Sequence, residues 1–371
     1  MKTMNNIIKI TKSMGQSLWL DSISREMINS GEIENLINAG ISGITSNPTI
    51  FDKAIGQSNV YDSALIEYSK TSENTEEIFE KLAIDDIKNA ANLLSKTYQY
   101  SNFNDGYVSI EVSPKHANDP EATIKQAERL WNKINKPNVM IKVPGTNEGF
   151  IAVKTLISKG INVNITLLFS VDQYEKTAYA YLDGLTEFAK SGLGATSSVC
   201  SVASFFISRI DTAVDNLLDE NSQLRGKIGI SNAKIAYDKY KKIFDKNLYG
   251  EGSFFPLYST GAKVQKPLWA STSVKNPDYD NNLYLNNLVG EETINTIPLE
   301  TFNNFSLSGK PNNSLIENID QAEENINLLS KQGIKFDDIT NQLLQDGIKA
   351  FSDSYDSLLK KINEKLSKLK S

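Results

Sequence analysis

The sequence predicts an α/β protein of the (β/α)8, or TIM, barrel class, with additional N- and C-terminal helices. Eight short apolar segments alternate with helical stretches, and no low-complexity linker separates them. Several of these segments are apolar at nearly every position, as parallel strands are when both faces of the sheet are covered. The 371 residues, 40% hydrophobic and 23% charged, suffice for one large barrel. We therefore expect a single domain over residues 1–371.

The expected strands are short, β-branched or aromatic, and bounded by turn residues. They cover residues 17–21, 43–48, 107–112, 139–144, 163–169, 198–207, 267–272 and 293–297. Helical spacing of apolar residues predicts helices over 24–39, 55–100, 120–135, 147–159, 171–192 and 208–247. The barrel core then spans about residues 17–300, after a polar lead-in or short helix over 1–16. A helical cover is expected over 314–371, and the Asn-rich stretches 276–287 and 302–313 are expected to be loops.

An open doubly wound sheet is the alternative fold. No Gly-x-Gly-x-x-Gly follows the first expected strand, and no Gly-x-x-x-x-Gly-Lys-Ser/Thr occurs, so nucleotide binding is not expected.

Composition excludes several functions. The net charge of −6 argues against a nucleic-acid partner. The single histidine, His116, and the single cysteine, Cys200, argue against His-rich or Cys-rich metal sites, and we expect no metal. His116 is expected in a loop and Cys200 in the core. No stretch is apolar enough to cross a membrane and no signal peptide is apparent, so we expect a cytoplasmic protein without membrane contact.

The most informative stretch is Val-Met-Ile-Lys-Val-Pro-Gly-Thr-Asn, residues 139–147. It places Lys142 inside an apolar strand that ends in a Pro-Gly turn. One interpretation is a lysine at a strand end that reaches solvent. The other is an amine whose pKa is lowered by burial, and which forms a Schiff base with a carbonyl compound.

Polar residues recur at the C-terminal ends of the other strands, where barrel enzymes place their catalytic groups. They are Asp21, Thr45, Asn47, Glu111, Asn164, Thr166, Ser204 and Ser271. Strand alternation predicts that Asn164, Thr166 and Leu168 share one face. Each such residue alone is most simply a hydrogen-bonded strand end. Together with one lysine, they indicate carbonyl chemistry through an iminium, with two carboxylates moving protons.

Six segments then resemble the transaldolase family, in its order, between residues 17 and 297. They are Leu-Trp-Leu-Asp-Ser, Gly-Ile-Thr-Ser-Asn-Pro-Thr-Ile-Phe, Ser-Ile-Glu-Val, Ile-Lys-Val-Pro-Gly-Thr, Gly-Ile-Asn-Val-Asn-Ile-Thr-Leu-Leu-Phe-Ser and Leu-Trp-Ala-Ser-Thr-Ser-Val-Lys-Asn-Pro. The chain is most similar to the longer bacterial subfamily. The resemblance implies a cofactor-independent transferase of the pentose phosphate pathway. It would move dihydroxyacetone from sedoheptulose 7-phosphate to glyceraldehyde 3-phosphate, giving erythrose 4-phosphate and fructose 6-phosphate.

The resemblance also implies roles for individual residues. Lys142 corresponds to the Schiff-base nucleophile, Asp21 to the acid/base at the C4 hydroxyl, and Glu111 to an acid/base that acts through a water. Thr166 matches the residue that positions this water. Asn47, Asn164 and Thr45 match the groups around the dihydroxyacetone part of the substrate.

For phosphate, the resemblance implies Ser204, Arg209 and Ser271. Shorter relatives carry an arginine two residues after the position of Ser271, whereas this chain has Ser273. We expect Lys275 to supply the second cation.

Two other functions stay open. A fructose-6-phosphate aldolase would release dihydroxyacetone rather than transfer it, but Glu111 and Phe206 match the transaldolase pattern where the small aldolases carry Gln and Tyr. A non-catalytic sugar-phosphate binder on the same barrel would not need the set of Asp21, Glu111 and Lys142. Related enzymes occur as monomers and dimers, so a homodimer is a further expectation.

Overall fold

The computed structural model describes residues 4–250 and 252–370 and contains a closed barrel of parallel strands. Neighbours in the barrel are neighbours in the sequence, and the last strand pairs with the first. The strands are β1 (Gln16–Leu20), β2 (Ile41–Ile44), β3 (Val108–Glu111), β4 (Val139–Pro144), β5 (Val163–Leu168), β6 (Ser201–Phe206), β7 (Lys266–Ala270) and β8 (Thr293–Ile297). The expected (β/α)8 barrel is confirmed.

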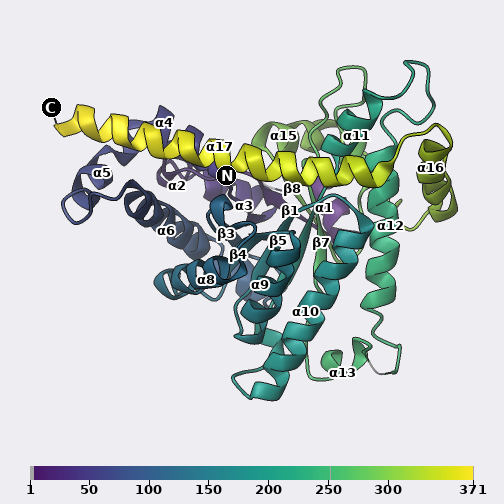
Figure 1. Ribbon diagram of the computed structural model, residues 1–371, viewed down its shortest axis with the longest axis horizontal. Helices are drawn as coiled ribbons and strands as arrows, with labels where there is room; N and C mark the ends of the chain where they lie inside the picture. The colour runs from purple at the N-terminus through teal and green to yellow at the C-terminus, as the bar shows by residue number, and fades with distance from the viewer. Residues whose placement is uncertain (1–3, 251, 371) are drawn as a thin grey trace.

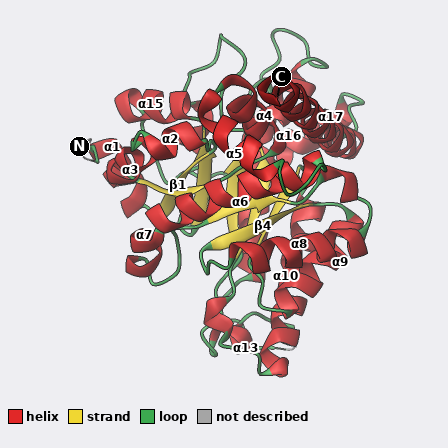
Figure 2. Cartoon of the chain, turned by 90° about the vertical axis from the view of Figure 1, so that its left-hand side faces the viewer, coloured by secondary structure: helices red, strands yellow, loops and turns green. Residues whose placement is uncertain are grey.

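Helices surround this barrel (Figures 1 and 2). In the first half of the chain they are α1 (Asn6–Ser13), α2 (Arg25–Asn29), α3 (Glu32–Ala39), α4 (Pro48–Gln57), η1 (Asn59–Tyr61), α5 (Asp62–Tyr68), α6 (Thr75–Leu93), α7 (Ser95–Tyr100), η2 (Pro114–His116), α8 (Pro120–Ile134), α9 (Asn147–Ser158) and α10 (Val171–Ser191). They continue with η3 (Thr196–Ser198), α11 (Ser208–Asp215), α12 (Ile228–Ile243), α13 (Phe255–Tyr258), α14 (Leu283–Asn287), α15 (Leu299–Ser308), α16 (Ile319–Lys331) and α17 (Phe336–Lys370). None of the described helices is long and apolar enough to span a bilayer.

Side-chain caps begin the helices that follow several strands. The Asn47 side chain accepts a hydrogen bond from the Ile50 N–H at 3.0 Å, and Thr146 accepts one from the Gly149 N–H at 2.9 Å. These caps satisfy backbone donors that have no partner within the helix. Each cap therefore fixes where the chain turns at the C-terminal end of the barrel.

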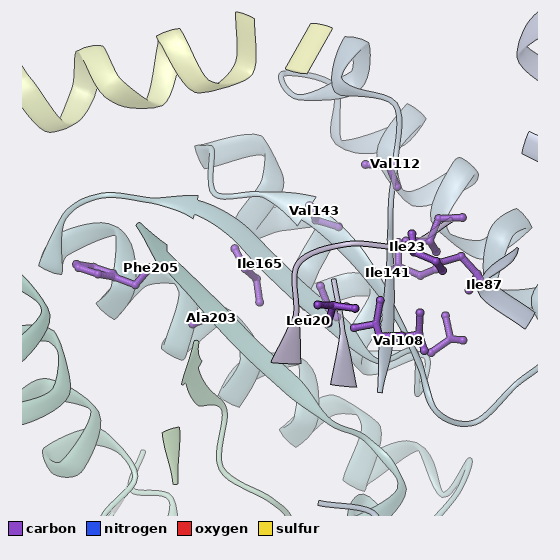
Figure 3. Packing of buried hydrophobic residues seen from close by; sticks show 14 of the residues in the cluster. Leu20, Ile23, Ile87, Val108, Val112, Ile141, Val143, Ile165, Ala203 and Phe205 are labelled. Carbon is purple, nitrogen blue, oxygen red and sulfur yellow. The ribbon is translucent and has the colours of Figure 1, made fainter. Parts of the chain in front are cut away.

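The core has two layers. The outer layer lies between strands and helices, and Figure 3 shows part of it: Leu20, Val108, Ile141, Ile165, Phe205 and Ile87 of α6. The inner layer fills the barrel and includes Trp19, Met140, Val202 and Ile294. Trp19 fits because Gly43 faces it: a Cβ on this glycine would lie 2.4 Å from the indole ring.

Helix α17, 35 residues long, crosses the C-terminal end of the barrel (Figure 1). It packs on α4, α11 and η2, which follow the C-terminal ends of β2, β6 and β3. Asp52 of α4 anchors it by an ion pair with Lys361 at 2.7 Å and a hydrogen bond from Ser357 at 3.1 Å. The helical cover expected over 314–371 thus consists of α16 and α17.

Several local expectations are wrong. The strand expected over 43–48 is β2 at Ile41–Ile44, with α4 beginning at Pro48, and the helix expected over 24–39 is two helices, α2 and α3. The Asn-rich stretches expected to be loops contain α14 and α15, because Phe302 and Phe305 of α15 occupy the core at helical spacing. The helix expected over 208–247 is two helices, α11 and α12, separated by a loop. Leu168 joins the outer layer instead of the face of Asn164 and Thr166. The alternation breaks because Leu167 has a φ of +61°.

Candidate active site

Lys142 lies near the C-terminal end of β4 with its side chain 5% exposed. Its Nζ is 3.3 Å from Glu111 Oε2 and donates a hydrogen bond to the Ser46 carbonyl oxygen at 3.2 Å. The strand register places Glu111 of β3 on one side of Lys142 and Asn164 of β5 on the other. The ammonium also lies 5.6 Å from the centre of the Phe351 ring. The interpretation of Lys142 as a solvent-reaching lysine is wrong, because the amine lies inside the barrel.

Two carboxylates share the site with this amine: Glu111, whose side chain is 3% exposed, and Asp21, which is half-buried. Burial raises the pKa of the Glu111 carboxyl above its ordinary value, and the Lys142 ammonium offsets part of that rise. Burial likewise raises the pKa of Asp21, while Lys142, a hydrogen bond from Thr45 and Arg209 counteract it. The Thr45 hydroxyl donates to Asp21 Oδ1 at 2.7 Å. Each carboxyl therefore holds a proton more readily than an exposed one does, which suits a group that alternately takes and returns a proton.

A chain of hydrogen bonds orients the Asn164 amide. Asn164 Nδ2 donates to Ser109 Oγ at 3.0 Å, and Ser204 Oγ donates to Asn164 Oδ1 at 2.7 Å. All three residues are at most 1% exposed. Since both ends of the amide have partners, its orientation is fixed.

Three other predicted residues, Thr166, Glu111 and Asn47, have free hydrogen-bonding capacity. Thr166 Oγ1 is buried and has no hydrogen-bond partner among the described residues. The two carboxylate oxygens of Glu111 also have no hydrogen-bond partner among the described residues. Oε2 forms only the ion pair with Lys142. The cap of α4 occupies Oδ1 of Asn47, so Nδ2 is the part of this amide left for a ligand.

The cationic end of the site is built by residues after β6 and β7. The Arg209 guanidinium packs on the Phe206 ring, 5.2 Å from its centre, and burial lowers its pKa. Arg209 and Lys275 form no ion pair with any carboxylate in the described part of the chain. Ser271 has a φ of +55° and its hydroxyl lies 2.9 Å from that of Ser208. Two cations without an ion-pair partner among the described residues, at one end of the site, suit an anionic group such as phosphate.

These residues enclose a cavity of about 150 Å³ at the C-terminal end of the barrel. Of the residues predicted for the site, all but Glu111 and Asn164 line it: Asp21, Thr45, Asn47, Lys142, Thr166, Ser204, Phe206, Arg209, Ser271 and Lys275. Glu111 and Asn164 lie directly beside Lys142 in the sheet. The structure thus brings the predicted set together around one amine.

The lining residues that the sequence analysis did not assign to the site include Thr296 and Phe351. Thr296 Oγ1 lies 2.6 Å from Thr45 Oγ1, so it belongs to the hydrogen bonds around Asp21. The rule that polar residues at strand ends form the site could have found it in β8. Phe351 lies on α17, and nothing in the local sequence sets it apart from the other apolar residues of that helix.

The residues excluded from the site lie elsewhere. His116 ends the short helix η2, and Cys200 is a buried free thiol. Within residues 4–250 and 252–370, no group of three or more His, Cys, Asp or Glu side chains could hold a metal ion.

Comparison with known proteins identifies the class of enzyme. The sequence profile of the family described as Transaldolase/Fructose-6-phosphate aldolase matches residues 18–362. The chain is 41% identical to a transaldolase of Trichodesmium erythraeum, over 98% of each chain. It is 41% identical to one of Thiobacillus denitrificans, covering 96% of this chain and 99% of that one. A transaldolase of Mycolicibacterium smegmatis is 39% identical over 93% of each chain.

The chain belongs to the transaldolase/fructose-6-phosphate aldolase family. Its full-length relatives carry the name transaldolase, so the expected family and transferase class are confirmed.

Proposed function

We propose that the chain is a transaldolase that moves a dihydroxyacetone unit between sugar phosphates through a Schiff base on Lys142. The observation that carries this proposal is the buried Lys142 amine, 3.3 Å from Glu111, in a cavity that ends at Arg209 and Lys275. The cavity therefore offers a nucleophile to a ketose carbonyl and cations to the phosphate at the other end of the sugar.

The proposed reaction begins when the neutral amine attacks C2 of sedoheptulose 7-phosphate. Loss of water gives an iminium, with Glu111 moving the protons through a water held by Thr166. Asp21 then takes the proton of the C4 hydroxyl, the C3–C4 bond breaks, and its electron pair forms an enamine with the iminium. Erythrose 4-phosphate leaves. The enamine carbon adds to the aldehyde of glyceraldehyde 3-phosphate, Asp21 returns its proton, and hydrolysis releases fructose 6-phosphate.

Several groups are placed to hold the substrate. Asn47 Nδ2 and the fixed Asn164 amide suit the hydroxyls of the dihydroxyacetone part. Arg209 offers a planar fork that can contact two phosphate oxygens, and Lys275 adds a point charge. The hydroxyls of Ser204 and Ser271 border the same cavity. This arrangement supports a phosphorylated rather than a neutral sugar as substrate.

The cellular context is part of the proposal. We place the enzyme in the cytoplasm and in the non-oxidative pentose phosphate pathway, where the named sugar phosphates are exchanged. The whole chain is proposed to act as one domain, with α16 and α17 as its cover. The homodimer stays a prediction, which light scattering on the full chain tests.

The decisive experiment traps the covalent intermediate. Borohydride reduction in the presence of fructose 6-phosphate is expected to add a reduced dihydroxyacetone unit to Lys142, located by mass analysis of peptides. Lys142→Ala is expected to lose both adduct and turnover, while Lys154→Ala, at an exposed lysine on α9, keeps both. Turnover without any adduct at Lys142 would contradict the proposal.

A second assay separates transaldolase from aldolase. With fructose 6-phosphate alone, the proposed enzyme releases little dihydroxyacetone, and addition of erythrose 4-phosphate produces sedoheptulose 7-phosphate. Dihydroxyacetone release at the same rate with and without the acceptor would instead identify an aldolase.

A further inference from the structure

A second cavity lies at the opposite end of the barrel from Lys142. It has a volume of about 520 Å³. Its floor is the inner layer of the barrel, formed by Trp19, Met140, Val202 and Ile294. Its rim is formed by the loop before β3 and by the segment between α13 and β7. Figures 1 and 2 show α13 on the side of the molecule away from α17.

The barrel interior separates this cavity from the catalytic one. Trp19 precedes Asp21 by two residues, and Met140 precedes Lys142 by two, so each lies one layer below a catalytic group on the same face of its strand. Both side chains are at most 1% exposed. A ligand in the large cavity therefore contacts neither the proposed substrate nor Lys142.

The rim carries an excess of positive charge. Lys263 Nζ donates to the Phe103 carbonyl oxygen at 2.6 Å, and Lys266 Nζ donates to that of Asn104 at 3.0 Å. Neither ammonium has a carboxylate within ion-pair distance in residues 4–250 and 252–370. Burial lowers the pKa of Lys263, with a further contribution from Lys266. The two ammonium groups donate to carbonyl oxygens of consecutive residues, so one dianion can contact both.

The third lysine at the rim is already neutralised. Lys246 forms an ion pair with Glu292 at 2.7 Å. The lining charges of Lys246, Lys263, Lys266 and Glu292 leave a local excess of two positive charges, in a chain whose net charge is −6. Such an excess in a concave surface concentrates anions there.

The walls are aromatic. Trp19, Tyr107 and Tyr258 line the cavity, and the Tyr107 hydroxyl is occupied by a hydrogen bond to the Phe103 carbonyl oxygen at 2.8 Å. Ring faces next to lysines suit a flat apolar body that carries the anionic group. The loop itself is held in an unusual conformation, since Phe103 has a φ of +63°.

We propose that this cavity binds a small organic phosphate, with the phosphate between Lys263 and Lys266 and an apolar body against Phe103 and Tyr258, whose rings are 42% and 44% exposed. A phosphate monoester is largely dianionic at pH 7, which matches two lysines better than a single carboxylate does. The site is distinct from the proposed phosphate subsite at Arg209 and Lys275.

Isothermal titration with phenyl phosphate tests the proposal. The titrated protein is the full chain with Arg209→Ala and Lys275→Ala, which removes the two cations of the proposed phosphate subsite in the catalytic cavity. We expect one remaining site, and at least tenfold weaker binding after Lys263→Ala and Lys266→Ala are added. The matched control adds Lys190→Ala and Lys241→Ala instead, two exposed lysines on α10 and α12, and keeps the affinity. Equal affinity in both proteins would overturn the proposal.

Further measurements test the apolar part of the proposed ligand and the independence of this cavity from the catalytic one. Tyr258→Ala removes a ring that is 44% exposed, so it should not impair folding, and is expected to weaken phenyl phosphate binding several-fold. Inorganic phosphate is expected to bind more weakly than phenyl phosphate. If the two bind equally, or Tyr258→Ala changes nothing, the assigned apolar body is wrong. Turnover of Lys263→Ala/Lys266→Ala with intact Arg209 should match the unmodified enzyme, which separates this site from the proposed function.

Discussion

Phe351→Ala tests whether α17 is part of the active site or only its cover. The Phe351 side chain lines the catalytic cavity, is 5% exposed, and its ring lies 5.6 Å from Lys142 Nζ. Truncating a buried phenylalanine to alanine costs about 3–5 kcal/mol of unfolding free energy. That loss alone reports only packing, so the test needs a variant with a similar loss elsewhere on the same helix.

Leu358→Ala supplies the comparison. Leu358 is fully buried on α17, one residue from Ser357, which bonds to Asp52 of α4. Its truncation costs about 2–5 kcal/mol of unfolding free energy. No residue of the catalytic cavity other than Phe351 lies on α17. We therefore expect Leu358→Ala to keep kcat/KM within about twofold, a negligible change in barrier, at temperatures where it stays folded.

Phe351→Ala should behave differently. It removes a ring whose cation–π contact with the positively charged iminium is worth about 1–2 kcal/mol in a desolvated site, and it admits water beside the Schiff base. At 1.36 kcal/mol per tenfold, this predicts a roughly 5- to 30-fold lower kcat/KM. The assay is coupled turnover of fructose 6-phosphate and erythrose 4-phosphate, with circular dichroism reporting the folded fraction. If both variants lose stability and neither loses kcat/KM, the reasoning about Phe351 is refuted.

Three further predictions follow from single interactions. Thr45→Val removes a hydrogen bond that lowers the pKa of Asp21, so this pKa should rise. The acid limb of the kcat/KM–pH profile should then move to higher pH. An unmoved limb would show that Asp21 does not control it. Burial raises the pKa of Asp211 to about 6. The contribution of the protonated carboxyl to the free energy of unfolding is therefore complete below pH 4 and is lost as the pH rises through 6. Between pH 4 and 7, denaturant titrations should show that Asp211→Asn loses up to roughly 3 kcal/mol less unfolding free energy than the natural chain. Gly149→Ala places a Cβ 2.0 Å from the Pro144 carbonyl oxygen and should lower the unfolding free energy by about 1–3 kcal/mol or more, whereas an unchanged denaturation midpoint would mean that the backbone shifts freely there.

The sequence predicts the site well where strand geometry alone positions the residues. Lys142, Glu111 and Asn164 are adjacent in the sheet because parallel strands in register bring equivalent positions together. Asp21 and Arg209 come from the ends of other strands, and the closed barrel turns those ends toward one cavity. The roles of these residues remain proposals, but their proximity follows from alternation and barrel closure.

What the sequence does not predict depends on packing between distant segments. Phe351 reaches Lys142 only because α17 crosses the barrel end, and α17 is held there by contacts such as Lys361 with Asp52. Leu168 faces the outer layer because Leu167 before it has a φ of +61°, and a strand pattern does not reveal such a conformation. In α15, core burial of Phe305 outweighs the weak helix propensity of an Asn-rich stretch.

Hydrogen bonding distinguishes two kinds of side chain in the site: those held in one position by their partners and those left free to react. The Asn164 amide has a partner at each end, and Thr45 contacts both Asp21 and Thr296, so their positions are fixed before a substrate arrives. The Glu111 oxygens have no hydrogen-bond partner among the described residues, and Lys142 makes only long contacts of 3.2 and 3.3 Å. Buried groups left in this state cost folding free energy. Because Glu111 and Lys142 are adjacent to each other and surrounded by groups held in place, this contrast matches what the proposed reaction requires of them.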